Sequence, residues 1–325
     1  MKLMQCPPAA SETSNSRNLP ALVGCQNQPP GHLFMVTLSS GILAARFSPL
    51  GAELKSLLET ATGRELIWPG STEFWNRSSP VLFPIVGRLK DNTYRYNGKA
   101  YQLSQHGFAR DKVFHILDQS EAHVKFRLEH DPDTLEVYPF AFMLDIEYRL
   151  EKACLTVKYH VHNPAREAMY FSLGAHPGFY CQAVQDKSSV KATMRLPLSQ
   201  ELLIYRLKDG LLETEPTEGL VSSIEGKIEL TDELIENDAM VFKRSLGPWI
   251  DLYVPDRPGR LRLSAKGWPY FGIWSKKGSP FVCLEPWYGI ADALDTNQEL
   301  TAKEGILTLA PGKSWTAEWS VELRA

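Results

Sequence analysis

Apolar and polar residues alternate with a period of two along most of the chain, beginning at Leu33. From Phe142 to Leu150 every second side chain is apolar, and mostly charged side chains lie between them. The pattern resumes after a turn at residues 151–153, and the C-terminal segment repeats it with Trp315, Ala317, Trp319, Val321 and Leu323. This period predicts antiparallel strands that bury one face and expose the other.

Short turn motifs mark where these strands reverse. Asn97–Gly98 lies between two tyrosine-containing segments, and both residues tolerate the positive φ that a two-residue hairpin requires. Residues 39–41, Ser-Ser-Gly, separate the strand-like residues 33–38 from residues 42–47. The sequence therefore predicts a hairpin at each of these two places.

Helical signals are sparse. Residues 230–240 predict a short helix capped by Thr231 or Asp232, or alternatively a loop that leads into a strand at residues 240–242. Many short strands, punctuated by 22 proline and 22 glycine residues, indicate one all-β domain over residues 32–325. Its apolar sheet faces need a second sheet against them, as in a sandwich or a barrel-like assembly.

The first 31 residues differ from the rest of the chain. They are rich in Pro, Ser, Asn and Gln and show little apolar periodicity, so we expect a loose N-terminal tail over residues 1–31. Residues 22–25 resemble a lipoprotein cleavage site, but the preceding segment is polar where a signal peptide is apolar. We therefore interpret that match as accidental.

Composition narrows the functional classes. A formal charge of −3 over 325 residues gives no electrostatic reason to expect nucleic acid or an anionic membrane as a partner. No apolar run approaches the roughly 20 residues of a membrane span. The five cysteines are scattered and form no C-x-x-C pair, so neither a structural zinc site nor a disulfide framework is indicated. A reducing, cytoplasmic setting is the simplest interpretation.

Three motifs stand out from the strand pattern: SQHGFARD at residues 104–111, GAHPGF at 174–179 and VCLEPWYGIAD at 282–292. They place His106 and His176 at strand ends beside glycine-containing turns, and they place Glu285 between an apolar triplet and a proline. An imidazole exchanges protons near neutral pH, and a desolvated glutamate becomes an effective base. Each residue also has a structural interpretation, as a turn residue or as the partner of an Arg or Lys.

Together with residues 79–111 (SPVLFPIVGRLKDNTYRYNGKAYQLSQHGFARD), these motifs resemble the aldose 1-epimerase (galactose mutarotase) family, and most closely its bacterial LacX-like branch. The resemblance extends over about residues 33–323. It implies a large antiparallel supersandwich, in agreement with the period of two. It also implies an isomerase that interconverts the α and β anomers of a hexose.

The resemblance also assigns roles to individual residues. Glu285 would remove the proton of the C1 hydroxyl, His176 would protonate the ring oxygen, and His106 would contact sugar oxygens. The two proton carriers exchange roles when the ring closes, so we expect pKa values drawn toward neutrality. The substrate-binding residues would be Arg88, Asp238 and Trp274. No metal or organic cofactor is required, because every step is a proton transfer.

Several alternatives stay open at this point. Ala239 follows Asp238 where galactose-specific members have a histidine, which leaves the identity of the sugar undecided. A hexose-6-phosphate epimerase would need a cationic clamp, for which the candidates are Arg88, Lys90 and Arg110. A protein of the same fold could bind carbohydrate without catalysis.

A two-histidine, one-carboxylate iron site is a further alternative, built from His106, His176 and Glu285. It is disfavoured because the sequence lacks the close H-x-D/E pair that such sites often include. The expected partner is a small-molecule sugar, bound by a monomer or a homodimer.

Overall fold

The computed structural model describes residues 34–181, 189–197, 201–216, 218–221, 226–235, 238–255 and 257–325. The tail expected at residues 1–31 lies outside these ranges. Within them, no helix has the length and apolar character needed to cross a membrane.

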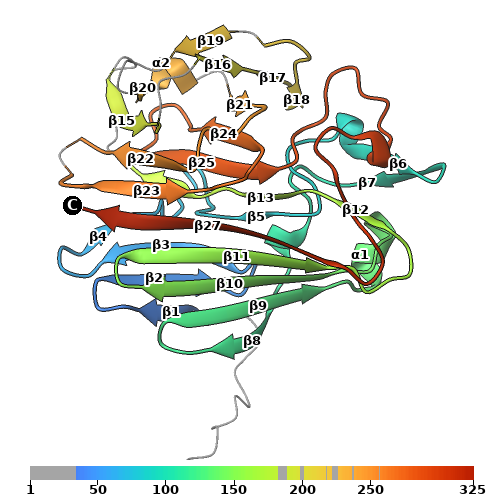
Figure 1. Ribbon diagram of the computed structural model, residues 1–325, viewed down its shortest axis with the longest axis horizontal. Helices are drawn as coiled ribbons and strands as arrows, with labels where there is room; N and C mark the ends of the chain where they lie inside the picture. The colour runs from blue at the N-terminus through green and yellow to red at the C-terminus, as the bar shows by residue number, and fades with distance from the viewer. Residues whose placement is uncertain are drawn as a thin grey trace, which may run out of the picture. The chain divides into compact units, whose positions relative to one another are not determined.

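The largest sheet has nine strands (Figure 1). Its strand order is β20 (Lys227–Thr231), β15 (Val190–Arg195), β22 (Trp249–Tyr253), β23 (Arg260–Ser264), β27 (Ser314–Arg324), β11 (Cys154–His162), β10 (Met143–Glu151), β9 (His123–Glu129) and β8 (His115–Gln119). Every pairing is antiparallel, and β10 and β11 pair over their whole length from Met143↔His162 to Glu151↔Cys154.

A second sheet has six strands. Its order is β21 (Met240–Phe242), β24 (Tyr270–Trp274), β25 (Phe281–Tyr288), β13 (Leu173–Ala175) and β5 (Val81–Leu82), with β14 (Gly178–Tyr180) also paired to β25. A third, four-stranded sheet consists of β1 (Val36–Ser39), β2 (Leu43–Ser48), β3 (Glu53–Glu59) and β4 (Arg64–Glu65).

Shorter elements connect these sheets. The two-stranded pairs are β6 (Thr93–Tyr96) with β7 (Lys99–Gln102), β12 (Met169–Phe171) with β26 (Leu307–Leu309), β16 (Glu201–Ile204) with β19 (Glu218–Val221), and β17 (Leu207–Lys208) with β18 (Leu211–Leu212). The helices are α1 (Pro132–Val137) and α2 (Asp232–Ile235), with 3₁₀ turns at η1 (Lys90–Asn92), η2 (Ala109–Asp111) and η3 (Leu300–Ala302).

Both predicted hairpins are confirmed. Strands β6 and β7 reverse at Asn97 and Gly98, whose φ angles of 50° and 75° are the positive values that such a turn needs. Strands β1 and β2 pair from Val36↔Phe47 to Ser39↔Ala44 around the Ser-Ser-Gly turn.

The segment at residues 230–240 combines both predicted alternatives. It contains the short helix α2, whose Leu234 backbone N–H donates to the Thr231 hydroxyl, and then strand β21. The sequence prediction missed helix α1. Its signal is Asp131 before a proline, and in the structure Asp131 and Thr134 form a reciprocal capping box.

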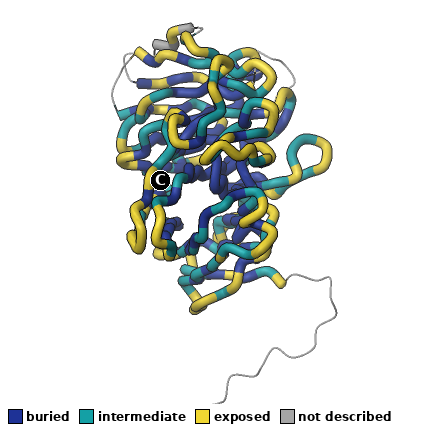
Figure 2. The backbone as a smooth tube through the Cα atoms, turned by 90° about the vertical axis from the view of Figure 1, so that its right-hand side faces the viewer, coloured by how far each residue is buried: buried dark blue, intermediate teal, exposed yellow. Residues whose placement is uncertain are grey.

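The apolar positions of the alternating strands form the core. Leu144, Ile146, Val157 and Val161 are all fully buried, and burial of each such side chain stabilises the fold by about 1.5–3 kcal/mol. Figure 2 shows this arrangement, with buried segments inside the layers and exposed segments at the connecting loops. The predicted all-β sandwich is therefore confirmed.

Candidate active site

Strand β25 forms the centre of the candidate site because it pairs with two consecutive strands on one side. Strand β13 pairs with it through Gly174↔Trp287, and β14 pairs through Gly178↔Cys283. The register is the same in both stretches, so His176, which lies between β13 and β14, falls opposite Glu285. The two side chains meet with His176 Nε2 3.2 Å from Glu285 Oε2.

His106 reaches the same place from a tight turn. His106 and Gly107 both have positive φ, and a side chain on Gly107 would clash with the backbone of Phe83. The Gly87 backbone N–H donates to His106 Nδ1 at 3.1 Å, which leaves Nε2 to carry the ring proton. The His106 and His176 ring centroids are 5.7 Å apart.

These three residues line one cavity of about 350 Å³, a size in the range of small-molecule sites. Three tryptophans also line it: Trp75, Trp274 and Trp287. The Trp75 ring lies 4.9 Å from the His176 ring, measured between centroids, and 5.5 Å from the Trp274 ring. Polar and aromatic surfaces therefore converge, as in sites that bind sugars through hydroxyl groups and C–H faces.

Burial controls the proton affinities of the central pair. Glu285 is 1% exposed, and burial raises the pKa of its carboxyl well above the usual range, with Asp238 adding to the shift and Trp287 opposing it. Burial lowers the pKa of His176 to about 3, and the positive charges of Arg110 and Arg77 act in the same direction. Both shifts favour the uncharged forms of the pair, a protonated carboxyl on Glu285 and a neutral imidazole on His176.

The expected drift toward neutrality is found for Glu285 but not for His176. The pKa of His176 moves away from neutrality because its imidazole is buried and lies near two guanidinium groups. Burial also lowers the pKa of His106 well below its usual value, so this ring stays neutral as well. Apart from the 3.2 Å contact with His176 Nε2, Glu285 Oε2 has no hydrogen-bond partner among the described residues.

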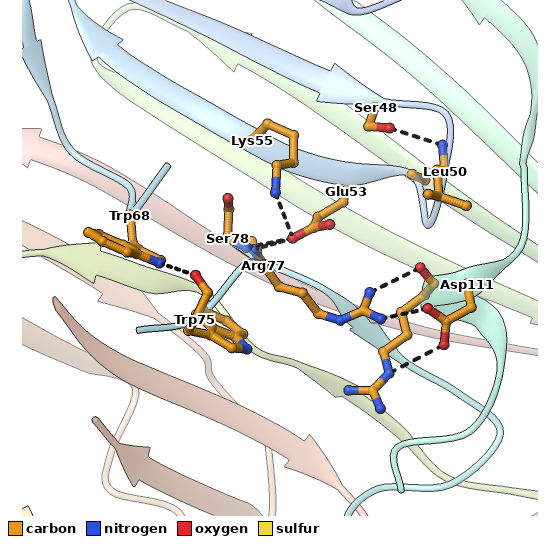
Figure 3. A network of polar contacts seen from close by, with 12 residues as sticks. Ser48, Leu50, Glu53, Lys55, Trp68, Trp75, Arg77, Ser78 and Asp111 are labelled. Carbon is orange, nitrogen blue, oxygen red and sulfur yellow. Dashed lines mark hydrogen bonds and ion pairs between the residues drawn. The ribbon is translucent and has the colours of Figure 1, made fainter. Parts of the chain in front are cut away.

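Hydrogen bonds from neighbouring segments hold the loop that carries Trp75 in place (Figure 3). The Trp75 carbonyl accepts a hydrogen bond from the Trp68 indole at 2.8 Å. Glu53 is 7% exposed and accepts hydrogen bonds from the backbone N–H groups of Ser78 and Ser79 at 2.6 and 3.1 Å, which satisfies a buried carboxylate.

Arg77 joins this loop to the segment that carries His106. Its guanidinium forms an ion pair with Asp111 and donates a hydrogen bond to the Arg110 carbonyl at 3.3 Å (Figure 3). The Arg110 guanidinium donates in turn to the Gln105 carbonyl at 2.6 Å. The polar network thus holds the two loops together at the cavity wall.

Of the residues expected from the sequence, five line the cavity: His106, His176, Asp238, Trp274 and Glu285. Arg88 does not. Its side chain packs against Gly210 and its guanidinium donates to the Asp209 carbonyl at 3.1 Å. Arg110, which follows His106 in the same motif, lies in the cavity wall instead. Among the described residues it is the only Arg or Lys there.

Trp75, Gln105 and Cys283 are the residues near the site that sequence reasoning missed. Trp75 belongs to a loop without regular alternation, so no local pattern distinguishes it from a surface aromatic residue. Gln105 and Cys283 lie inside quoted motifs, but only the turn and strand geometry show where their side chains lie.

The fold and the cavity define a class of protein: a large antiparallel sandwich whose six-stranded sheet presents a buried imidazole–carboxylate pair to a tryptophan-lined pocket. The sequence profile of the Aldose 1-epimerase family matches residues 35–322, and the chain belongs to that family. The chromosomal LacX protein of Lactococcus lactis subsp. lactis is 26% identical over 285 residues, which cover 85% of this chain and 95% of the relative.

Two solved structures extend the likeness to three dimensions. The galactose mutarotase related enzyme from Lactobacillus acidophilus is 32% identical with a TM-score of 0.83, over 90% of this chain and 98% of its own. A galactose mutarotase-like protein from Lactobacillus casei is 30% identical with a TM-score of 0.82, over 90% of this chain and all of its own (100%). The similarity in each case extends over nearly the whole described sandwich.

Proposed function

We propose that this protein is an aldose 1-epimerase that interconverts the α and β anomers of an unphosphorylated hexose. The observation that carries the proposal is the contact between His176 and Glu285, 3.2 Å apart, in the wall of a cavity of about 350 Å³. The hydroxyl oxygen O1 and the ring oxygen O5 are bonded to the same carbon, so two neighbouring proton carriers can serve both.

The reaction consists of two proton transfers in each direction. Glu285, as carboxylate, takes the proton of the C1 hydroxyl while His176, as imidazolium, protonates O5, and the C1–O5 bond breaks to give the open aldehyde. Rotation about C1–C2 turns the other face of the aldehyde toward O5, and the two carriers return the protons in reversed roles. In this scheme the single proton shared by the pair moves from carboxyl to imidazole to start the cycle.

The surrounding residues bind and orient the sugar in this scheme. His106 offers its Nε2 proton to a sugar oxygen, because Nδ1 accepts from Gly87. Arg110 and Asp238 contact hydroxyl groups, and Trp75 and Trp274 cover the apolar C–H face of the ring. Removing one group of the proton-carrying pair disables the chemistry but leaves these contacts in place.

The test is polarimetry on freshly dissolved α-glucose and α-galactose. We expect Glu285→Gln and His176→Asn each to lower the turnover number by about 10²–10⁴-fold, since each removes a proton carrier. The exposed His115→Asn is the matched control and should keep the parental rate.

Circular dichroism and thermal melting check that each variant is folded. Parental rates in both active-site variants would refute the mechanism, and a parent protein that binds sugar without accelerating mutarotation would identify a binding protein.

An unphosphorylated substrate is favoured because few cationic side chains face the cavity. Two of the three clamp candidates are engaged elsewhere: Arg88 donates to the Asp209 carbonyl and Lys90 donates to the Leu294 carbonyl at 2.9 Å. Arg110 alone faces the cavity among the described residues, and it is already bonded to Gln105. We expect kcat/KM to be higher for glucose than for glucose 6-phosphate. The reverse order in the same polarimetric assay would favour the phosphosugar alternative.

A further inference from the structure

Strand β25 has two different faces, and the cavity face carries more than the proton-transfer pair. Val282 and Leu284 point into the main core. Cys283 belongs to the opposite face and packs with Trp68 and Phe281 next to the cavity. Because side chains alternate along a strand, Cys283 and Glu285 project on the same side.

This arrangement brings three possible metal ligands together. One ligand atom each from His176, Cys283 and Glu285 lies within 4.8 Å of the other two. Cys283 is fully buried, Glu285 is 1% exposed and His176 is 8% exposed. Apart from its 3.2 Å contact with His176 Nε2, Glu285 Oε2 has no hydrogen-bond partner among the described residues, although burial ordinarily demands one.

We propose that His176, Cys283 and Glu285 form a binding site for a thiophilic divalent cation such as Zn²⁺, and that the bound ion blocks the sugar site. The donor set of one nitrogen, one sulfur and one oxygen suits Zn²⁺, which binds all three at about 2.0–2.3 Å. The 3.2 Å separation of His176 Nε2 and Glu285 Oε2 is close to that of adjacent ligands on one tetrahedral ion.

Charge balance favours the same ion. A thiolate and a carboxylate together neutralise a divalent cation, so the loaded site carries no net charge in its buried surroundings. Binding releases the thiol proton, and also the carboxyl proton when Glu285 is protonated. Three protein ligands leave a fourth position open toward the cavity, for water or a sugar hydroxyl.

The cluster differs from the iron site considered for the sequence. His106 is not part of it, and a thiol takes the place of the second imidazole. A thiolate ligand shifts the preference from the iron of oxygenases toward zinc. The binding claim stands on geometry alone, whereas inhibition of mutarotation also rests on the proposed function.

Direct binding is tested with the full chain after treatment with a chelator. Titration calorimetry with Zn²⁺ should show one ion per chain, and Co²⁺ should produce the absorption band of a thiolate–cobalt bond. We expect Cys283→Ser to weaken Zn²⁺ binding by at least about tenfold and to abolish that band. Cys181→Ser is the matched control, since Cys181 is also buried but lies outside the cluster, and it should keep both.

Glu285→Gln provides a second variant in case Cys283→Ser does not fold. It retains the thiolate band with Co²⁺ but binds Zn²⁺ more weakly, because it removes a negative charge from the ligand set. A parent protein without a thiolate–cobalt band, or a Cys283→Ser variant that binds Zn²⁺ as tightly as the parent, overturns the proposal.

Inhibition is measured separately by polarimetry, with each protein compared with its own metal-free rate. Zn²⁺ should slow mutarotation by the parent protein and by Cys181→Ser, and a chelator should restore the rate. The inhibition constant of Zn²⁺ for Cys283→Ser should be at least about tenfold higher than for the parent protein. Binding without inhibition would refute the blocking claim alone. A metal-free parent without mutarotase activity would refute the proposed function and leave the calorimetric result standing.

Discussion

At the scale of single residues, burial decides the chemistry of the site. The same desolvation raises the pKa of Glu285 and lowers those of His176 and His106, because in each case it disfavours the charged form. Nearby charges reinforce these shifts, with Asp238 acting on Glu285 and Arg110 on His176. The result is a group of neutral donors and acceptors in contact with the cavity.

The pKa of His176 makes the stability of the protein sensitive to acid. This pKa is about 3 in the folded protein and 6.5 in the unfolded chain. The contribution of this neutral imidazole to the free energy of unfolding is therefore complete above pH 6.5 and is lost as the pH falls toward 3. We expect His176→Asn to reduce the slope of unfolding free energy against pH in this window by up to about 1.4 kcal/mol per pH unit. Urea unfolding at a series of pH values measures this slope, with His115→Asn as the control. Parallel curves for the parent and His176→Asn would contradict the assignment.

The same two groups set the pH dependence of the proposed mutarotation. Activity requires one proton on the pair, so it falls when a second proton binds His176 at low pH or when the last proton leaves at high pH. We expect the acid limb of kcat/KM to lie well below pH 6.5, and the alkaline limb to lie well above the usual pKa of a glutamate. Polarimetry corrected for the spontaneous rate measures both limbs. An acid limb near pH 6.5 would show that the imidazole is not desolvated in the working enzyme.

At the scale of elements, strand β25 and its neighbours hold the pair in place. Gly272 of β24 pairs directly with Glu285, and the Trp287 ring covers Gly272 so closely that an added Cβ would lie 2.3 Å from it. This glycine is required for close packing and not for its backbone angle. It leaves the space that the Trp287 ring occupies against β24.

Substitution at this position should therefore disturb the site through packing. We expect Gly272→Ala to destabilise the fold by about 1–3 kcal/mol and to raise KM more than it lowers kcat, because the displaced Trp287 narrows the cavity. The control is Gly219→Ala on β19, where a Cβ would meet its nearest neighbour at an ordinary 3.5 Å. Equal melting temperatures for parent and Gly272→Ala would show that the ring moves freely.

At the scale of the whole sandwich, the hydrogen bonds of a buried ion pair connect the nine-stranded sheet with the segment that follows β24 of the six-stranded sheet. Lys191 of β15 is fully buried and forms an ion pair with Asp232 at the start of α2. Its ammonium also donates to the Ser275 hydroxyl at 3.1 Å, directly after β24 and Trp274. Asp232 accepts in turn from the Gly278 backbone N–H at 2.8 Å. The nine-stranded sheet is thus tied to the strand end that carries a tryptophan of the cavity.

Breaking this pair should cost far more than breaking a surface pair. We expect Lys191→Met to lower the free energy of unfolding by about 3–5 kcal/mol, since it leaves the Asp232 carboxylate buried and unpaired. Lys112→Met, which removes a more exposed partner of Asp131, should cost about 1 kcal/mol or less. Chemical denaturation of the two variants side by side measures the difference. Similar losses in both would mean that water reaches the Lys191 site.

The sequence by itself determined the local structure and the chemical inventory of this protein. The period of two fixes which strand faces are buried, and Asn97–Gly98 fixes a hairpin, because these preferences belong to neighbouring residues. The motifs also pointed to His106, His176 and Glu285, whose side chains all line one cavity.

Only the tertiary structure decided which side chains meet. The contact between His176 and Glu285 depends on the shared register of β13 and β14 on β25, and that register results from pairing between segments far apart in the chain. The same pairing sets His176 beside Cys283 as well, while packing of the loops places Arg110, and not Arg88, in the cavity wall. Such placements minimise the free energy of the whole sandwich, so no local pattern of residues specifies them.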